Sequence, residues 1–163
     1  MKTRGYWGQL TGVKLSGRQY AMTLITRMES INDLLTDYRA SSGPSTIEQI
    51  EAAEAALGTP IPRDLSEFLV SRGPGEGFVG AGGYLAITPP EDWPSKHTIL
   101  EASINWPGLL IFGSDGGGEF FAFDKDTLIY VEVDAIGDPD RRPLGRSFVE
   151  FVTSLAERRY GDT

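Results

Sequence analysis

The sequence has no cysteine and only one histidine, His97, among its 163 residues. Without cysteine the chain has no disulfide, no thiol nucleophile and no thiolate-ligated metal cluster, which fits a reducing compartment such as the cytoplasm. A motif with two histidine ligands is impossible, so a histidine-based zinc site would need carboxylates for its other ligands. These absences remove several common kinds of catalytic and metal site.

Long hydrophobic runs are also missing. The longest uninterrupted ones, such as LLIF (109–112) and FFAF (120–123), have four residues, whereas a bilayer-spanning helix needs about 20. The composition is otherwise that of an average globular domain, with 40% hydrophobic and 23% charged residues. The sequence therefore predicts one soluble domain, long enough to bury a core without covalent cross-links.

Positive charge is scarce over most of the chain. The net charge is −8, but residues 1–27 carry five basic and no acidic residues, so residues 28–163 have a net charge of −13. Such a body repels nucleic acid and anionic membranes, and it attracts basic proteins. The alternative is that the acidic surface only keeps the protein soluble.

Residues 1–27 form a basic arm without a clear helical or strand period, and its AMTLI run is too short for a secretory signal. Three interpretations are open: a flexible arm, a strand or hairpin docked on the body, or a stretch that precedes the native start. We assign no function to the arm and predict a single domain over residues 28–163.

The first part of this domain has the pattern of helices. Apolar residues recur with a period of 3.6 over residues 28–39, and capping-box spacings at Ser45 and Thr46 predict a second helix that ends at Gly58. Pro62 suits the first turn of a third helix, and the short link predicts a helical hairpin. Residues 73–83 hold six glycines, which indicates a loop or an irregular pair of strands.

Strands follow. GYLAI (83–87) is a predicted strand, residues 91–106 are ambiguous, and LLIF and FFAF flank an Asp115-Gly116 hairpin turn. The alternation in LIYVEVD (128–134) predicts that its valines face inward and that Tyr130 and Glu132 face the other side. A polar loop then leads to a last helix capped by Ser147. Helices, then strands, then a helix give an α+β fold.

No catalytic or metal-binding constellation emerges from the residues. GSDGGGE (113–119) lacks the lysine and the spacing of a phosphate-binding loop, and it joins two strands. A Ser114–His97–Asp115 triad is disfavoured because the serine and the aspartate are adjacent, so His97 is interpreted as a packing or surface residue. The acids from Asp124 to Asp140 fit solvated turns better than a calcium loop. A pair of catalytic carboxylates stays open as an alternative, because their separation depends on the tertiary fold.

Three stretches together resemble the SUKH superfamily, which includes the Smi/Knr cell-wall-assembly regulators. They are TIEQIEAAEAALGTPIPRDLSEFLVSRGPGEG, LLIFGSDGGGEFFAFD and SFVEFVTSL, within residues 45–156. The family's usual "NG" after the second helix of the hairpin is replaced here by Arg72 and Gly73, and residues 1–44 fall outside the resemblance.

The resemblance implies an α+β domain with helices packed on a mixed, mostly antiparallel sheet, and no catalytic residue, metal or cofactor. Bacterial members are commonly immunity proteins that neutralise a cognate toxin, often a nuclease, and fungal members regulate through protein contacts. We therefore expect a protein-binding module, with a cognate toxin or another basic protein as its partner and neither nucleic acid nor membrane. A regulatory scaffold and an unrecognised carboxylate-dependent hydrolase are the alternatives.

Partner-binding residues are predicted here from charge, aromatic character and placement in loops or on strand faces, and no family motif assigns them that role. They are Glu76, Asp92, Trp93, Asp115, Glu119 and Glu132.

Overall fold

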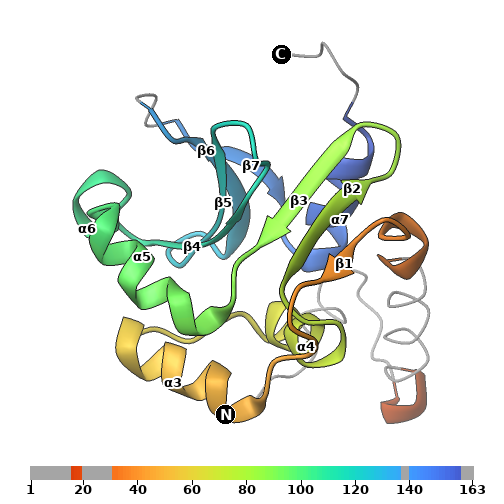
Figure 1. Cartoon of the computed structure of the whole chain (residues 1–163), viewed down its shortest axis with the longest axis horizontal. Helices are drawn as coiled ribbons and strands as arrows, with labels where there is room; N and C mark the ends of the chain where they lie inside the picture. The colour runs from red at the N-terminus through yellow and green to blue at the C-terminus, as the bar shows by residue number, and fades with distance from the viewer. Residues whose placement is uncertain (1–15, 20–30, 137–139, 159–163) are drawn as a thin grey trace.

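The computed structural model describes residues 16–19, 31–136 and 140–158 (Figure 1). The basic arm predicted over residues 1–27 lies outside the described residues except for residues 16–19, an exposed stretch of which 17–19 are helical.

One antiparallel sheet runs through the described part of the chain, and its seven strands follow the order of the sequence. The strands are β1 (Arg39–Ala40), β2 (Gly75–Val79), β3 (Gly83–Ile87), β4 (Leu109–Ser114), β5 (Glu119–Asp124), β6 (Ile129–Asp134) and β7 (Arg142–Gly145). Each strand thus pairs with the strand that follows it in the chain. This confirms the predicted α+β fold, and the sheet expected to be mixed and mostly antiparallel has antiparallel pairs at every described position.

Helices come before β2 and after β7, as the sequence predicts, and also between β3 and β4, where residues 91–106 were ambiguous in the sequence. They are α3 (Ile47–Leu57), α4 (Arg63–Ser71), the 3-10 turn η1 (Pro90–Asp92), α5 (Trp93–Ile99), α6 (Ala102–Asn105) and α7 (Phe148–Ala156). A capping box at Thr46 opens α3, Gly58 ends it with a φ of 68°, and Ser147 caps α7. Pro62 lies one residue before α4, at its N-cap.

The main core lies between one face of the sheet and helices α4 and α7. Phe68, Phe148 and Phe151 from these helices pack with Phe112, Phe121 and Tyr130 from the strands, mostly in tilted or edge-to-face contacts. Helix α3 adds Ile50 and Ala53, and it packs against η1 and α5.

A smaller second core lies on the other face of the sheet. Ala102 of α6 and Trp106, just after it, pack there with Ile111 of β4, Ala122 of β5 and Val133 of β6. Both faces of β4, β5 and β6 are therefore covered, which explains the continuous apolar runs in β4 and β5.

This two-sided burial corrects the prediction for β6. The valines are buried as expected, but Tyr130 and Glu132 on the opposite face are buried too, with exposed fractions of 0% and 1%. An alternating pattern is typical of a strand with one solvated face, whereas in this fold α7 covers the Tyr130 side and α6 covers the valine side.

Two further segments differ from the prediction. Part of the predicted polar loop is strand β7, which pairs with β6 so that Arg142 lies opposite Glu132. In the first predicted helix, residues 31–34 are helical, but the chain then turns and enters β1. Residues 28–30 lie outside the described part of the chain.

The segment over residues 31–41 is fixed to the body by its side chains. Ile31, Leu35 and Tyr38 are buried in the main core, and the Tyr38 hydroxyl donates to the Gly73 carbonyl at 2.9 Å. The Arg72 guanidinium donates to the side chain of Asn32 and to the carbonyl of Leu35. The folded unit therefore includes residues that lie before the stretches carrying the family resemblance.

Candidate protein-binding surface

On the second sheet face, none of the helices in the described part of the chain covers β2 and β3. In the register, Glu76 of β2, Ala86 of β3, Ser114 of β4 and Phe120 of β5 form one row across the sheet, so these side chains share a face. Helix α6 covers the part of this face at β4 to β6, whereas β2 and β3 show theirs to the viewer in Figure 1, with α7 behind them. We call Glu76, Phe78, Tyr84 and Ala86 the open sheet face.

Two aromatic rings dominate the open sheet face. Phe78 and Tyr84 are cross-strand partners whose ring centroids lie 5.3 Å apart at 80°, and Phe78 is 55% exposed. The Tyr84 hydroxyl donates to Oε2 of Glu76 at 2.9 Å, and this hydrogen bond raises the pKa of the tyrosine. A carboxylate is thus held at the end of an exposed aromatic pair.

The Asp115 turn between β4 and β5 borders this surface. Oδ1 of Asp115 accepts hydrogen bonds from the backbone N–H groups of Gly117 (2.8 Å) and Glu119 (3.1 Å), which confirms the predicted hairpin. A Cβ built on Gly116 would lie 3.5 Å from the Tyr84 ring. Tyr84 therefore links Glu76 to the turn, and two of the predicted binding residues lie at one surface.

Two other predicted residues are accessible but lie elsewhere. Glu119 faces the opposite side of the sheet, in the register row of Asp134, and makes an ion pair of 2.5 Å with Arg142. Burial, opposed by Arg142 and reinforced by neighbouring acids, raises its pKa. Asp92 is exposed in η1, which follows the end of β3 and is not part of the open sheet face.

The remaining two predicted residues are not at the surface, which corrects that expectation. Trp93 is 0% exposed, and its indole N–H donates to the Thr88 carbonyl at 2.8 Å. The acidic, proline-rich loop that suggested a surface anchor is the start of α5, whose first side chain enters the main core. Glu132 forms ion pairs with Arg142 and Arg158 on the α7 side of β6. Neither side chain is available to a partner.

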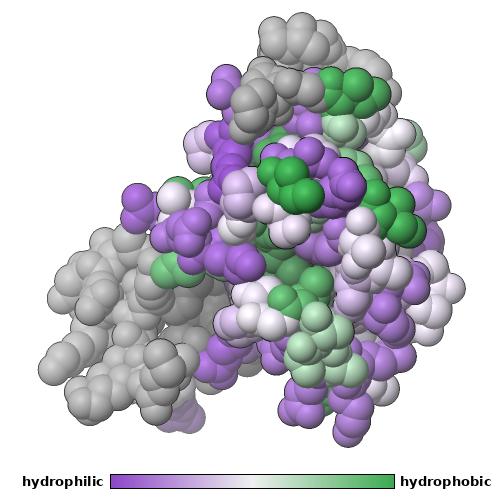
Figure 2. All heavy atoms as spheres, turned by 90° about the vertical axis from the view of Figure 1, so that its left-hand side faces the viewer, coloured by the Kyte–Doolittle hydropathy of each residue, from purple (hydrophilic) through white to green (hydrophobic). Residues whose placement is uncertain are grey.

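Helices α5 and α6 present two exposed apolar side chains, Ile99 (80%) and Ile104 (74%). Figure 2 looks at the side of the molecule that carries these helices and shows small hydrophobic clusters separated by hydrophilic atoms. This side offers scattered apolar contacts and no continuous hydrophobic patch.

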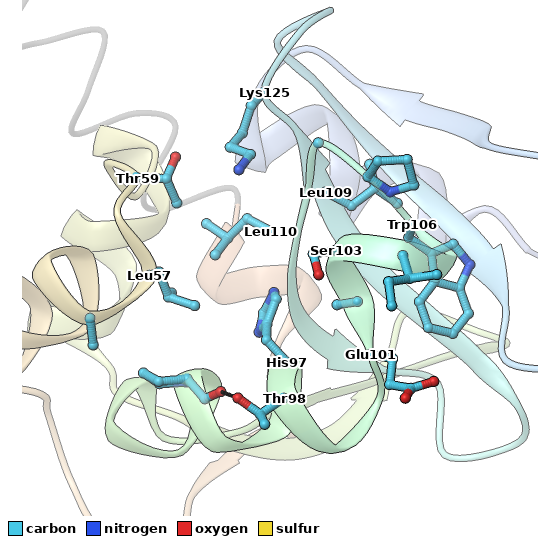
Figure 3. A pocket seen from close by; sticks show the side chains of 16 residues that line it. Leu57, Thr59, His97, Thr98, Glu101, Ser103, Trp106, Leu109, Leu110 and Lys125 are labelled. Carbon is cyan, nitrogen blue, oxygen red and sulfur yellow. Dashed lines mark hydrogen bonds between the residues drawn. The ribbon is translucent and has the colours of Figure 1, made fainter.

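A cleft of about 540 Å³ opens on this side, between the end of α3, helices α5 and α6, and the start of β4 (Figure 3). Leu57, Trp106 and Leu110 supply apolar walls, and Lys125 lies at its margin. Among the described residues that line it, Glu101 is the only carboxylate. The carboxylate-hydrolase alternative requires two acids in one pocket, and this cleft does not supply them.

His97 lies in the cleft wall and is occupied by structural hydrogen bonds. Its Nδ1 lies 2.7 Å from the Trp93 carbonyl, and Nε2 lies 3.0 Å from the backbone N–H of Ile111. Because Nε2 accepts and Nδ1–H donates, the imidazole is neutral, and burial lowers its pKa. His97 therefore ties α5 to β4, in agreement with its interpretation as a packing residue.

Other buried charges are also paired within the fold. Asp124 accepts from Arg141 at 3.0 Å and from two backbone N–H groups of the turn after β5. In the described ranges, no group of three or more His, Cys, Asp or Glu side chains is arranged to hold a metal ion. No described helix is both long and apolar enough to cross a membrane.

Residues 44–154 match the SMI1 / KNR4 family (SUKH-1). This chain belongs to that family. The match covers α3 to most of α7, and with it the open sheet face and the Asp115 turn. The predicted SUKH resemblance is thereby confirmed. A search of curated proteins found no match to this chain.

Proposed function

We propose that this SUKH-1 protein is a cytoplasmic immunity protein that binds a cognate toxin and neutralises it by covering the toxin's surface, without catalysing a reaction. The observation that carries the proposal is the open sheet face, where an exposed aromatic pair and Glu76 lie beside the Asp115 turn. Aromatic side chains are the commonest anchors of protein interfaces.

Charge supports a basic partner. Residues 28–163 have a net charge of −13, and long-range attraction between opposite charges accelerates association. In the described residues, Arg39 lies across from Glu76 in the register, yet its Nη1 donates to the carbonyls of Thr36 and Tyr38. The Glu76 carboxylate thus accepts a hydrogen bond from the Tyr84 hydroxyl and can accept further ones from a partner.

The test starts from the neighbouring genes: a toxin domain that they encode is used in a growth-rescue and binding experiment, and the absence of one would count against the immunity role. We expect co-expression of the full chain to restore growth and the purified proteins to associate at a rate that falls steeply with salt. Failure to protect cells from the toxin would reject the immunity role. A set of several weak partners and no toxin would favour the regulatory-scaffold alternative.

Variants locate the interface. Glu76→Lys reverses one charge on the open sheet face and is expected to slow association about tenfold at low salt. Glu51→Lys makes the same change on the exposed side of α3 and is the matched control. Equal association rates for the two variants would show that the toxin binds another surface.

A further inference from the structure

The open sheet face presents three groups that recognise a guanidinium. The Phe78 ring is more than half exposed, the Tyr84 ring stands edge-to-face against it, and Glu76 lies at the tyrosine hydroxyl. Arginine differs from lysine because its planar cation stacks on aromatic rings while its N–H groups donate in a fixed plane to a carboxylate. The aromatic pair and the carboxylate together match the two kinds of contact that an arginine side chain makes.

The Glu76 carboxylate has capacity left for a donor. Oε2 accepts from Tyr84, and no described side chain makes an ion pair with Glu76. The hydrogen bond from Tyr84 fixes the carboxylate beside the rings. Less conformational entropy is therefore lost when a cation binds to it. The contrast with Glu119 and Glu132 is clear, because arginines of the same chain already occupy both of those carboxylates.

We propose that Phe78, Tyr84 and Glu76 form a subsite for an arginine side chain of the partner protein. The guanidinium lies on the exposed aromatic pair and donates to Glu76, and the Asp115 turn adds negative charge at the border. This inference rests on the proposed binding function and names the partner's chemistry: a basic surface that projects an arginine into this face.

The subsite can be tested without the toxin. The full chain, labelled with ¹⁵N, is titrated with the peptide acetyl-Gly-Arg-Gly-amide, and with peptides that carry lysine or citrulline at the same place. We expect chemical-shift changes concentrated at Glu76, Phe78, Tyr84 and Gly116, with the arginine peptide binding more tightly than the other two. Equal effects from citrulline, or shifts spread evenly over the acidic residues, would overturn the proposal.

Three variants separate the contributions. Glu76→Gln removes the charge, and Phe78→Leu removes the π face while it keeps an apolar side chain; each is expected to weaken arginine-peptide binding about fivefold. Glu51→Gln on α3 is the control and should bind as the parent does. Because Phe78 and Glu76 are exposed, the amide spectra should show that all three variants are folded. Unchanged affinity in Glu76→Gln or in Phe78→Leu would reject the subsite.

The two proposals fail separately. If the arginine peptide binds as expected but the chain does not rescue cells from the toxin, the subsite stands and the immunity role is rejected. If the chain neutralises the toxin with the same affinity in Glu76→Gln and in the parent, the immunity role stands and the arginine subsite is rejected.

Discussion

Tyr130 of β6 donates its phenolic hydrogen to Oδ1 of Asp64 at 2.6 Å, although 66 residues separate the two in the chain. The same carboxylate accepts the backbone N–H of Phe148 at 2.6 Å, at the start of α7, and that of Leu65 in α4. One carboxylate thus ties both helices to the sheet. Burial, and then the negative charge of Asp64, raises the pKa of Tyr130.

Removal of this hydroxyl should destabilise the fold. Tyr130→Phe deletes a hydrogen bond to a charged acceptor inside the main core, and we expect the free energy of unfolding to fall by about 2 kcal/mol. Asp64→Ala should cost more, because it also removes the acceptor at the start of α7 and leaves the buried Tyr130 hydroxyl without its partner. Urea denaturation monitored by circular dichroism measures both values.

Glu67→Gln is the control for these two variants. Glu67 makes an exposed i,i+4 ion pair with Arg63 on the same helix, and such pairs contribute about 0.5 kcal/mol or less. If Tyr130→Phe proved no less stable than Glu67→Gln, the Asp64–Tyr130 bond would have no part in holding β6 to α4.

Glu132 should act as a structural residue. It is 1% exposed and lies between Arg158, which follows α7, and Arg142 of β7. Loss of its charge leaves two arginines facing a neutral side chain, so Glu132→Gln is expected to lower the free energy of unfolding by about 3 kcal/mol. Denaturant titrations of the parent and the variant measure this loss.

Arg142→Gln provides the comparison. The Arg142 side chain is 53% exposed, and in Arg142→Gln the Glu132 carboxylate keeps its ion pair with Arg158. Arg142→Gln should therefore lower the free energy of unfolding clearly less than Glu132→Gln does. A smaller effect from Glu132→Gln than from Arg142→Gln would contradict the assignment of Glu132 as the centre of this cluster.

Stability should depend on pH through His97. Its neutral ring accepts from Ile111, and burial holds its pKa in the folded protein below the ordinary value of 6.5. Above pH 6.5 the contribution of His97 to stability is complete. As the pH falls below 6.5, His97 is protonated in the unfolded chain but not in the folded chain, so the free energy of unfolding decreases. This decrease ends once the pH is below the pKa of His97 in the folded protein. Urea midpoints at pH 7.5 and 5.5 should show this decrease.

His97→Gln isolates the contribution, because His97 is the only histidine of the chain. The raised pKa of Glu119 acts in the opposite direction, but equally in parent and variant, so it cancels when their pH dependences are subtracted. The same slope in both proteins would show that the imidazole is not held neutral against Ile111.

The sequence predicted the elements whose signals are local. Capping residues located the starts of α3 and α7, Gly58 located the end of α3, and Asp115-Gly116 located a hairpin turn. It missed features that depend on tertiary neighbours. Strand β7 contains charged residues and a proline, and it becomes a strand because Arg142 reaches Glu119 and Glu132 on the neighbouring strands.

The same distinction applies to the candidate surface. Glu76 was chosen for its charge and its place in a glycine-rich loop or irregular pair of strands, and it is exposed on β2. Trp93 and Glu132 were misplaced because the elements that cover them, the main core and α7, approach from distant parts of the chain. Phe78 and Tyr84 were not selected from the sequence, and only their cross-strand register brings their rings together.

The backbone of residues 37–40 packs directly against the glycines of β2. A Cβ on Gly77 would lie 2.3 Å from the Asp37 carbonyl oxygen, so Gly77→Ala must push the segment over residues 31–41 away from the sheet. We expect a loss on the order of 3 kcal/mol in the free energy of unfolding and faster amide hydrogen exchange at Leu35 and Tyr38. Gly117→Ala, whose Cβ would meet nothing closer than 3.6 Å, should change stability by about 0.5 kcal/mol or less. Equal stability of the two variants would mean that residues 37–40 do not lie against β2.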